Sequence, residues 1–134
     1  MTQPTQVVEV AAALVRDAGG RYLITQRLAG AHLAGRWEFP GGKREAGETL
    51  QGCLARELRE ELGIDVAVGE KVDTVRWEYG EKTVVLHFYR CRITGGTLQL
   101  LECAALDWVE PARFADYDFP PADQHLIDRL RAAG

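Results

Sequence analysis

The chain lacks any apolar run approaching the ~20 residues that a membrane-spanning helix needs. It also lacks an excess of basic charge, because 16 lysines and arginines against 20 aspartates and glutamates give a net charge of −4. A protein that binds duplex nucleic acid normally carries a basic patch or stripe. Internal repeats and low-complexity segments are missing as well. The sequence therefore predicts neither a membrane nor a nucleic acid as a partner.

Cysteine is scarce, with only Cys53, Cys91 and Cys103 in the chain. Their number is odd and their spacing is not that of a metal site, so we expect neither a disulfide framework nor a zinc site. Each cysteine stands among apolar residues, which predicts buried free thiols in a reducing cytoplasm. Residues 1–6 have no basic stretch that would open a signal peptide, so we expect a loose lead-in and a cytoplasmic location.

The length of 134 residues and the hydrophobic fraction of 46% are those of one globular domain. Two β-rich segments, 7–15 and 21–27, flank a turn at 17–20, which predicts a hairpin of two partner strands. Further predicted features are a loop at 28–36, extended segments at 37–39, 66–68, 72–79, 83–93 and 105–109, and turns at 80–82 and 95–96. Pro120-Pro121 is expected to open a helix over residues 122–133. Strands combined with helices predict a mixed α/β domain.

Residues 48–62 are dominated by Leu, Ala, Arg, Glu and Gln, with no proline and a single glycine. This composition predicts a helix that starts near Thr49 and stops at Gly63. The spacing of its glutamates at i, i+3 and i+4 would place three carboxylates on one face, where each like-charged pair costs roughly 0.2–0.5 kcal/mol. A solvated face with ordinary ion pairs is one interpretation. The other is a bound cation that offsets the repulsion, and oxygen ligands suit Mg²⁺ or Mn²⁺.

Residues 42–64 match the pattern Gly-x5-Glu-x7-Arg-Glu-Leu-x-Glu-Glu-x-Gly-Ile at every fixed position. This segment resembles the Nudix box, and the chain is similar to MutT-like Nudix hydrolases. The similarity extends to Arg27, to residues 31–34 and 37–43, and to residues 119–123. It implies the Nudix fold, a mixed β-sheet sandwiched between α-helices, in a single domain over residues 1–134. It also implies a Mg²⁺-dependent enzyme that sanitises the nucleotide pool by cleaving (d)NTP to (d)NMP and diphosphate.

The resemblance assigns roles to individual residues. The implied metal ligands are the carbonyl of Gly41 and the carboxylates of Glu57, Glu60, Glu61 and Glu102. Arg56 would orient the glutamates by ion pairing. Glu57 would act as the general base, with Glu102 as the alternative. The implied substrate-binding residues are Arg27 and Lys43 near the phosphates, Glu38 in the phosphate or metal region, and Val8, Val10, Tyr79 and Val84 around the base. His32 is expected to be structural.

Asp123 bears on which base the enzyme would accept. MutT-like enzymes that prefer 8-oxo-dGTP carry Asn at this position, whereas the Pro-Ala-Asp form is similar to that of Nudix CTP pyrophosphohydrolases. An ionised Asp only accepts hydrogen bonds, which suits the N4 amino group of cytosine. A protonated Asp could donate to an oxidised guanine. Asp123 is also placed to start a helix. Both 8-oxo-dGTP and (d)CTP therefore stay open as substrates.

Two other interpretations compete with a triphosphate diphosphatase. One is a Nudix hydrolase for another diphosphate, such as a nucleotide sugar, a dinucleoside polyphosphate or an RNA cap. The other is a non-catalytic nucleotide-binding module, although such modules typically lose box glutamates and all four are intact here. The sequence is compatible with a monomer or a small homo-oligomer.

Overall fold

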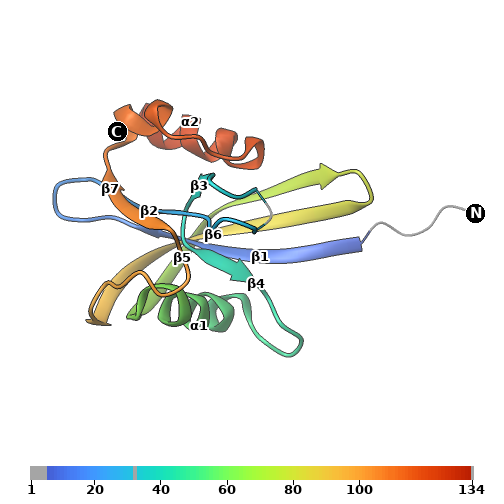
Figure 1. The fold of residues 1–134 in the computed structure, drawn as a ribbon, viewed down its shortest axis with the longest axis horizontal. Helices are drawn as coiled ribbons and strands as arrows, with labels where there is room; N and C mark the ends of the chain where they lie inside the picture. The colour runs from blue at the N-terminus through green and yellow to red at the C-terminus, as the bar shows by residue number, and fades with distance from the viewer. Residues whose placement is uncertain (1–5, 32, 134) are drawn as a thin grey trace, which may run out of the picture.

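The computed structural model describes residues 6–31 and 33–133, in which two β-sheets lie between two α-helices (Figure 1). The four-stranded sheet has the order β4-β1-β6-β5, with bounds Gly41–Lys43, Gln6–Val15, Lys82–Gly96 and Ile64–Tyr79. The three-stranded sheet has the order β3-β2-β7, with bounds Trp37–Glu38, Tyr22–Gln26 and Ala105–Val109. The α-helices are α1 (Leu50–Leu62) and α2 (Gln124–Ala133), and the 3₁₀ turns are η1 (Pro111–Asp116) and η2 (Pro121–Asp123).

Strand β1 runs parallel to β6, whereas every other strand pairing is antiparallel. Successive side chains of a strand point to opposite faces, so β1 serves two cores. Ala11 and Ala13 pack with the buried leucines of α1. Ala12 and Leu14 pack on the other face with the apolar side of α2 and with buried aromatic rings. The mixed sheet between helices confirms the predicted fold class.

Local signals define the ends of α1. The Thr49 side chain accepts a hydrogen bond from the Gly52 N–H at 3.0 Å, which caps the N-terminus. Gly63 adopts a left-handed conformation with φ of 69°, and its N–H donates to the carbonyl of Arg59. A glycine reaches this conformation without the strain that a side chain would cause. The predicted start and stop are both confirmed.

The predicted pairing of the first two strands is wrong. The turn at residues 17–20 is present, with the Gly20 N–H donating to the Asp17 carbonyl at 3.1 Å. The strands on either side meet only at a bridge between Arg16 and Tyr22 and then enter different sheets. Strand β1 is buried on both faces near its end and uses both edges, pairing with β4 and β6. Strand β2 therefore pairs with β3 and β7 instead.

Three further boundaries differ from the sequence prediction. The extended segments predicted at 66–68 and 72–79 belong to one strand, β5, whose register shifts between Val68 and Lys71 and between Lys71 and Asp73. The predicted turn at 95–96 lies inside β6, where these glycines pair with Asp65 and Ile64. The predicted helix over 122–133 begins as the 3₁₀ turn η2 before α2. No helix among the described residues is long and apolar enough to cross a membrane.

Candidate active site

A cleft of about 570 Å³ lies on the α2 side of the four-stranded sheet and reaches α1 at one end. This volume is within the usual range for sites that bind small molecules. The sequence-predicted residues that line it are Val8, Val10, Arg27, Glu38, Gly41, Lys43, Glu57, Glu61, Tyr79, Val84, Glu102 and Asp123. The structure thus brings together residues that are separated by more than a hundred positions in the chain.

Two glycines allow the backbone of β4 to approach its neighbours closely. A Cβ atom at Gly41 would overlap the carbonyl oxygen of Ala11, and one at Gly42 would overlap the carboxylate of Glu57. Gly41 also has a φ of 159°. The absence of side chains therefore places the Glu57 carboxylate directly against the backbone of β4.

Arg56 lies at the centre of a group of box glutamates. Its guanidinium contacts the Glu48 carboxylate at 2.7 and 2.9 Å, Glu57 at 3.0 Å and Glu60 at 3.1 Å. It also donates to the carbonyl of Lys43 at 3.2 Å. The hydrogen bonds from Arg56, joined by one from the backbone N–H of residue 45, lower the pKa of Glu48 to about 2. Arg56 thus contacts three of the box carboxylates, and its orienting role stays a prediction.

Glu61 is the carboxylate most enclosed by the protein at this end of the cleft. Its Oε2 atom is buried and has no hydrogen-bond partner in the described structure. Burial raises its pKa to about 9, and the charges of Glu57 and Glu38 add to the effect, against a hydrogen bond from the Gly41 backbone. Burial also raises the pKa of Glu57, in spite of the nearby Arg56. A buried oxygen without a partner beside a second carboxylate fits a bound cation, which would supply the missing interaction.

Glu102 reaches the same place from the loop between β6 and β7. The N–H groups of Leu101 and Glu102 donate to the carbonyl of Glu61 at 3.0 and 3.2 Å, and that of Gln99 donates to Leu62 at 2.9 Å. The negative charge of Glu102 contributes to the raised pKa of both Glu57 and Glu61. Glu102 thus lines the carboxylate end of the cleft, and its role there stays a prediction.

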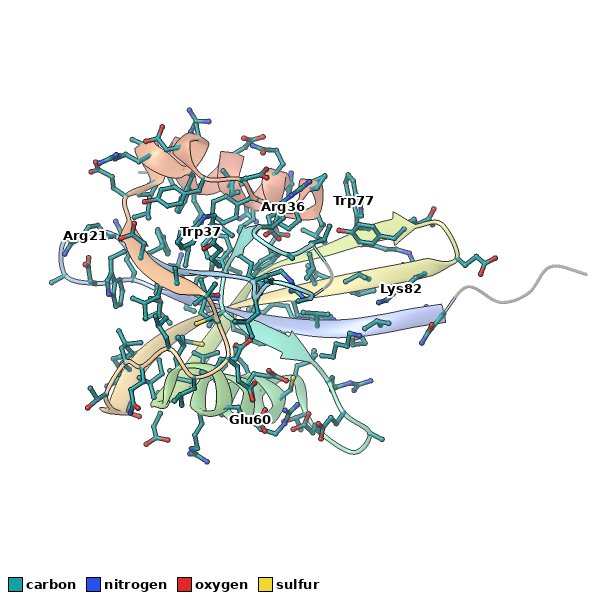
Figure 2. The ribbon with its side chains drawn as sticks, viewed as in Figure 1. Arg21, Arg36, Trp37, Glu60, Trp77 and Lys82 are labelled. Atoms are coloured by element: carbon teal, nitrogen blue, oxygen red, sulfur yellow. The ribbon has the colours of Figure 1, made fainter. Side chains whose placement is uncertain are left out.

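Glu60 differs from the other predicted ligands because it does not line the cleft. It lies along α1 on the side of the sheets away from α2 (Figure 2), and its side chain is 48% exposed and paired with Arg56. On a helix, residues at i+3 and i+4 fall on either side of residue i, so Glu60 and Glu61 diverge around Glu57. Within residues 6–31 and 33–133, no three His, Cys, Asp or Glu side chains form a ready-made metal cage. Mg²⁺ needs none, since it commonly keeps several waters and binds substrate phosphates.

The other end of the cleft is largely apolar and contains Asp123. Val8 pairs with Val84 in the register of β1 and β6, and both side chains line the cleft. Asp123 is only 5% exposed, and burial together with the charge of Glu38 raises its pKa to about 7. The charge of Asp123 in turn raises the pKa of Tyr79, whose own burial is the larger cause. Asp123 and Tyr79 therefore both line the cleft and lie close enough for the charge of one to act on the other.

Arg27 and Glu38 form an ion pair between the two ends. The Arg27 guanidinium donates to Glu38 Oε2 at 2.8 Å. Thr25 pairs with Glu38 between β2 and β3, and Arg27 follows directly after the end of β2. Burial raises the pKa of Glu38, although Arg27 opposes this shift. Because Glu38 influences the pKa of both Glu61 and Asp123, it links the carboxylate end electrostatically to the end that contains Asp123.

Sequence reasoning missed several residues of the cleft, including Lys82, Leu86 and Phe88. Leu86 and Phe88 share the face of Val84 at the two-residue period of a strand, which was a usable signal. Lys82 was assigned to a turn but is the first residue of β6. His32 lies outside the described residues.

Cys103 was predicted to be a buried thiol in an apolar setting, and this prediction is wrong. It is half-buried and lines the cleft, where the charges of Glu61 and Glu38 join burial in raising its pKa. Cys53 and Cys91 are buried, and all three thiols are free, as expected.

The family of the chain follows from its match to known proteins. A model of the NUDIX domain family matches residues 11–129. The chain belongs to the Nudix hydrolase family. It is 40% identical to the CTP pyrophosphohydrolase of Escherichia coli strain K12 over 127 residues, which cover 95% of this chain and 93% of that protein. It is 45% identical to a putative 8-oxo-dGTP diphosphatase 2 of Mycobacterium tuberculosis over 126 residues, which cover 92% and 86% of the two chains.

A solved structure with a similar sequence supports the fold of this Nudix hydrolase. The solution structure of the Escherichia coli ORF135 protein matches with a TM-score of 0.80 at 40% identity, covering 96% of this chain and 94% of that one. The family, the fold and the enzyme class predicted from residues 42–64 are therefore confirmed. Nudix hydrolases generally use divalent metal ions, which agrees with the carboxylate-lined end of the cleft.

Proposed function

We propose that this Nudix hydrolase is a Mg²⁺-dependent nucleoside triphosphate diphosphatase that converts (d)NTP and water to (d)NMP and diphosphate. One observation carries the proposal: a single cleft joins carboxylates at one end to a largely apolar end that contains Asp123. The names of the two relatives, a CTP pyrophosphohydrolase and a putative 8-oxo-dGTP diphosphatase, support the same reaction class. An enzyme of the nucleotide pool would act in the cytoplasm.

The buried, unpartnered Oε2 of Glu61 supports a metal ion at the carboxylate end. Residues that would hold it are the carbonyl of Gly41 and the carboxylates of Glu57, Glu60, Glu61 and Glu102. Glu60 would have to turn away from Arg56 to take part. Mg²⁺ is the natural cation for oxygen ligands beside phosphates, and Mn²⁺ would use the same ligands. When bound, the metal neutralises phosphate charge and makes the phosphorus more electrophilic.

The side chains of the cleft supply the remaining chemistry. Glu57 would take a proton from the attacking water, since it is half-buried in the cleft and is oriented by Arg56. Glu102 is the alternative base, because the backbone holds it beside Glu61. Lys43 and Arg27 line the cleft and would face the phosphates. Placement and charge stabilisation would account for most of the acceleration, as in other phosphoryl transfers.

Asp123 would contact the base, and its raised pKa of about 7 supports both candidate substrates. The ionised carboxylate accepts a hydrogen bond and would suit the N4 amino group of cytosine. The protonated carboxyl also donates and would suit the additional oxo group of 8-oxo-guanine. Near neutral pH the two forms would coexist, so the proposed substrates are 8-oxo-dGTP and (d)CTP.

The proposal is tested by measuring kcat/KM with Mg²⁺ for 8-oxo-dGTP, dGTP, dCTP, 5-methyl-dCTP and CTP, while quantifying diphosphate and phosphate. We expect diphosphate as the product. We also expect a strong preference either for 8-oxo-dGTP or for the cytidine nucleotides. Asp123→Asn should shift that preference toward oxidised guanine. Asp128→Asn, at an exposed position of α2 that accepts a hydrogen bond from Gln124, serves as the control.

Three results would contradict parts of the proposal. Release of inorganic phosphate, or turnover only of a nucleotide sugar or dinucleoside polyphosphate, would mean another Nudix substrate class. Absence of turnover despite Mg²⁺ binding would favour a non-catalytic module. An unchanged substrate ratio in Asp123→Asn would show that Asp123 does not contact the base.

A further inference from the structure

Strand β5 contains an irregular segment around Lys71 and Asp73, where the register against β6 shifts twice. The two side chains leave it on opposite faces of the sheet. Lys71 pairs with Tyr89, which belongs to the core beneath α1. Asp73 pairs with Phe88, which belongs to the core beneath α2 and lines the cleft. A β-bulge commonly redirects a side chain in this way.

On the α1 face, the bulge is held to two neighbouring strands. Lys71 Nζ lies 2.8 Å from Nδ1 of His87, and Nε2 of His87 lies 2.8 Å from Oε2 of Glu9. An ammonium group only donates, so Nδ1 of His87 accepts from Lys71 and Nε2–H donates to Glu9. His87 is buried, so this chain of hydrogen bonds ties β5 to β6 and β1 inside the structure.

On the α2 face, the bulge is held to the helix. Oδ1 of Asp73 accepts from the Thr74 N–H at 2.8 Å, while Oδ2 lies 2.8 Å from Nη1 of Arg129 and 3.7 Å from Nε2 of His125. Arg129 also donates to the carbonyl of Val72 at 3.3 Å. One guanidinium thus contacts two consecutive residues of the bulge. The Asp73 side chain is 16% exposed, so Arg129 meets a largely enclosed carboxylate.

The helix that carries Arg129 starts directly after Asp123. Turn η2, which contains Asp123, lies against β5, so the same strand contacts both the turn and the helix. Apolar side chains of α2, Leu126, Ile127 and Leu130, hold the helix on the core. Apolar contact has little directional preference, and it leaves the exact axial position of a helix to other interactions. An ion pair between two groups fixed on different elements, here Asp73 and Arg129 at 2.8 Å, together with the hydrogen bond from Arg129 to the Val72 carbonyl, supplies that direction.

We propose that Asp73 and Arg129 are positioning residues, which fix α2 along β5 and thereby place the Asp123 carboxyl in the cleft. The inference rests on the proposed function, since it concerns how that cleft discriminates between bases. Neither residue lines the cleft, so their effect on the base acts through η2 and Asp123. The carboxylates of α1 are attached to the opposite side of the sheet and are unaffected.

The kinetic test uses Asp73→Asn and Arg129→Gln, with Arg129→Lys as the conservative variant. Buried apolar area holds α2 more strongly than a partly exposed ion pair, so both variants should stay folded. We expect KM for the preferred substrate to rise while kcat changes little. The ratio of kcat/KM for 8-oxo-dGTP to kcat/KM for dCTP should move about tenfold toward one, because the Asp123 carboxyl would be misplaced by less than about 1 Å. Arg129→Lys should restore most of the ratio.

Glu70→Gln is the matched control. It removes an ion pair with Arg90 at 2.9 Å, which starts from the same strand but does not involve α2. This variant should keep the wild-type KM and substrate ratio. If Glu70→Gln changed KM and the substrate ratio as much as Asp73→Asn does, the proposal would be overturned, because any ion pair on β5 would then have the same effect.

Hydrogen exchange gives a second readout that needs no substrate. The Asp123 amide donates to the Pro120 carbonyl at 3.0 Å and should exchange faster in Asp73→Asn and Arg129→Gln. The Cys53 amide, bonded to the Thr49 carbonyl at 2.9 Å in α1, should be unchanged. Wild-type exchange at Asp123 in both variants would overturn the proposal. If the wild-type protein hydrolyses no nucleotide, the proposed function fails, while this measurement still decides whether Asp73 positions Asp123.

Discussion

The carbonyl of Glu61 accepts hydrogen bonds from the N–H groups of both Leu101 and Glu102, at 3.0 and 3.2 Å. The last carbonyls of a helix have no partner within the helix and need donors from elsewhere. Here the donors come from the loop that carries Glu102, so the same contacts that complete α1 also bring a carboxylate to the cleft. Helix capping and construction of the site therefore depend on each other.

Glu61→Gln should separate stability from activity. Because the pKa of Glu61 is raised to about 9, the carboxyl is protonated at neutral pH without metal, and Gln matches it in shape and charge. We expect the free energy of unfolding in EDTA to change by less than about 1 kcal/mol. The value of kcat should fall at least about 100-fold, because several kcal/mol of metal-dependent stabilisation would be lost. Urea unfolding of both proteins in EDTA checks the first part, and a near-wild-type kcat would remove Glu61 from the proposed ligands.

Arg56→Lys should lower activity through the glutamates that Arg56 contacts. Lysine cannot reproduce the two contacts to Glu48 together with those to Glu57 and Glu60. We expect a loss of about 10- to 100-fold in kcat or in the apparent affinity for Mg²⁺, measured by Mg²⁺ titration of the initial rate. Arg59→Lys is the control on the same helix, since the ion pair of the Arg59 guanidinium is with the half-exposed Asp65 and involves none of the box glutamates. Equal losses in both variants would argue against an orienting role.

Gly42→Ala should displace one carboxylate without disrupting the fold. The new Cβ would overlap the end of the Glu57 side chain, which can move, and would meet no backbone atom as closely. We expect kcat to fall by about 100-fold for a shift of about 1 Å, with a small change in Tm. In Gly19→Ala the atom nearest to the new Cβ would be 3.4 Å away, so this variant should keep the wild-type kcat in the same assay. Full activity in Gly42→Ala would show that the close approach of Glu57 to β4 is dispensable.

The burial of Asp123 predicts a pH dependence of stability. Its pKa is about 7 in the folded protein and about 3.9 when exposed, so the folded state keeps a proton that the unfolded chain has lost. The stabilisation is complete below about pH 4 and is lost as the pH rises through about 7. Asp123→Asn lacks this titration.

Urea unfolding of both proteins in EDTA over this pH range checks the prediction. The free energy of unfolding of the wild type, minus that of Asp123→Asn, should fall between about pH 4 and about pH 7 and be level outside this window. Asp128→Asn should show no such difference from the wild type, because Asp128 is exposed. Parallel curves for wild type and Asp123→Asn would mean that Asp123 is ionised in the folded protein.

The sequence by itself determined α1, its caps and the box, because these depend on contacts within a few residues. Thr49 caps Gly52 three residues on, and Gly63 supplies a left-handed residue where the helix ends. The spacing of the box also predicted that Glu57 and Glu60 would lie near each other, and the Arg56 guanidinium contacts both.

Only the tertiary structure decided how distant segments meet. It placed β1 and β2 in different sheets, separated Glu60 from Glu57 and Glu61 at the cleft, and brought Cys103 into acidic surroundings. It also brought Glu38 close enough to Asp123 to raise the pKa of that carboxyl, and joined Asp73 to Arg129. Strand pairing and burial depend on which surfaces remain available after the whole chain has packed. The composition of a few neighbouring residues does not determine this.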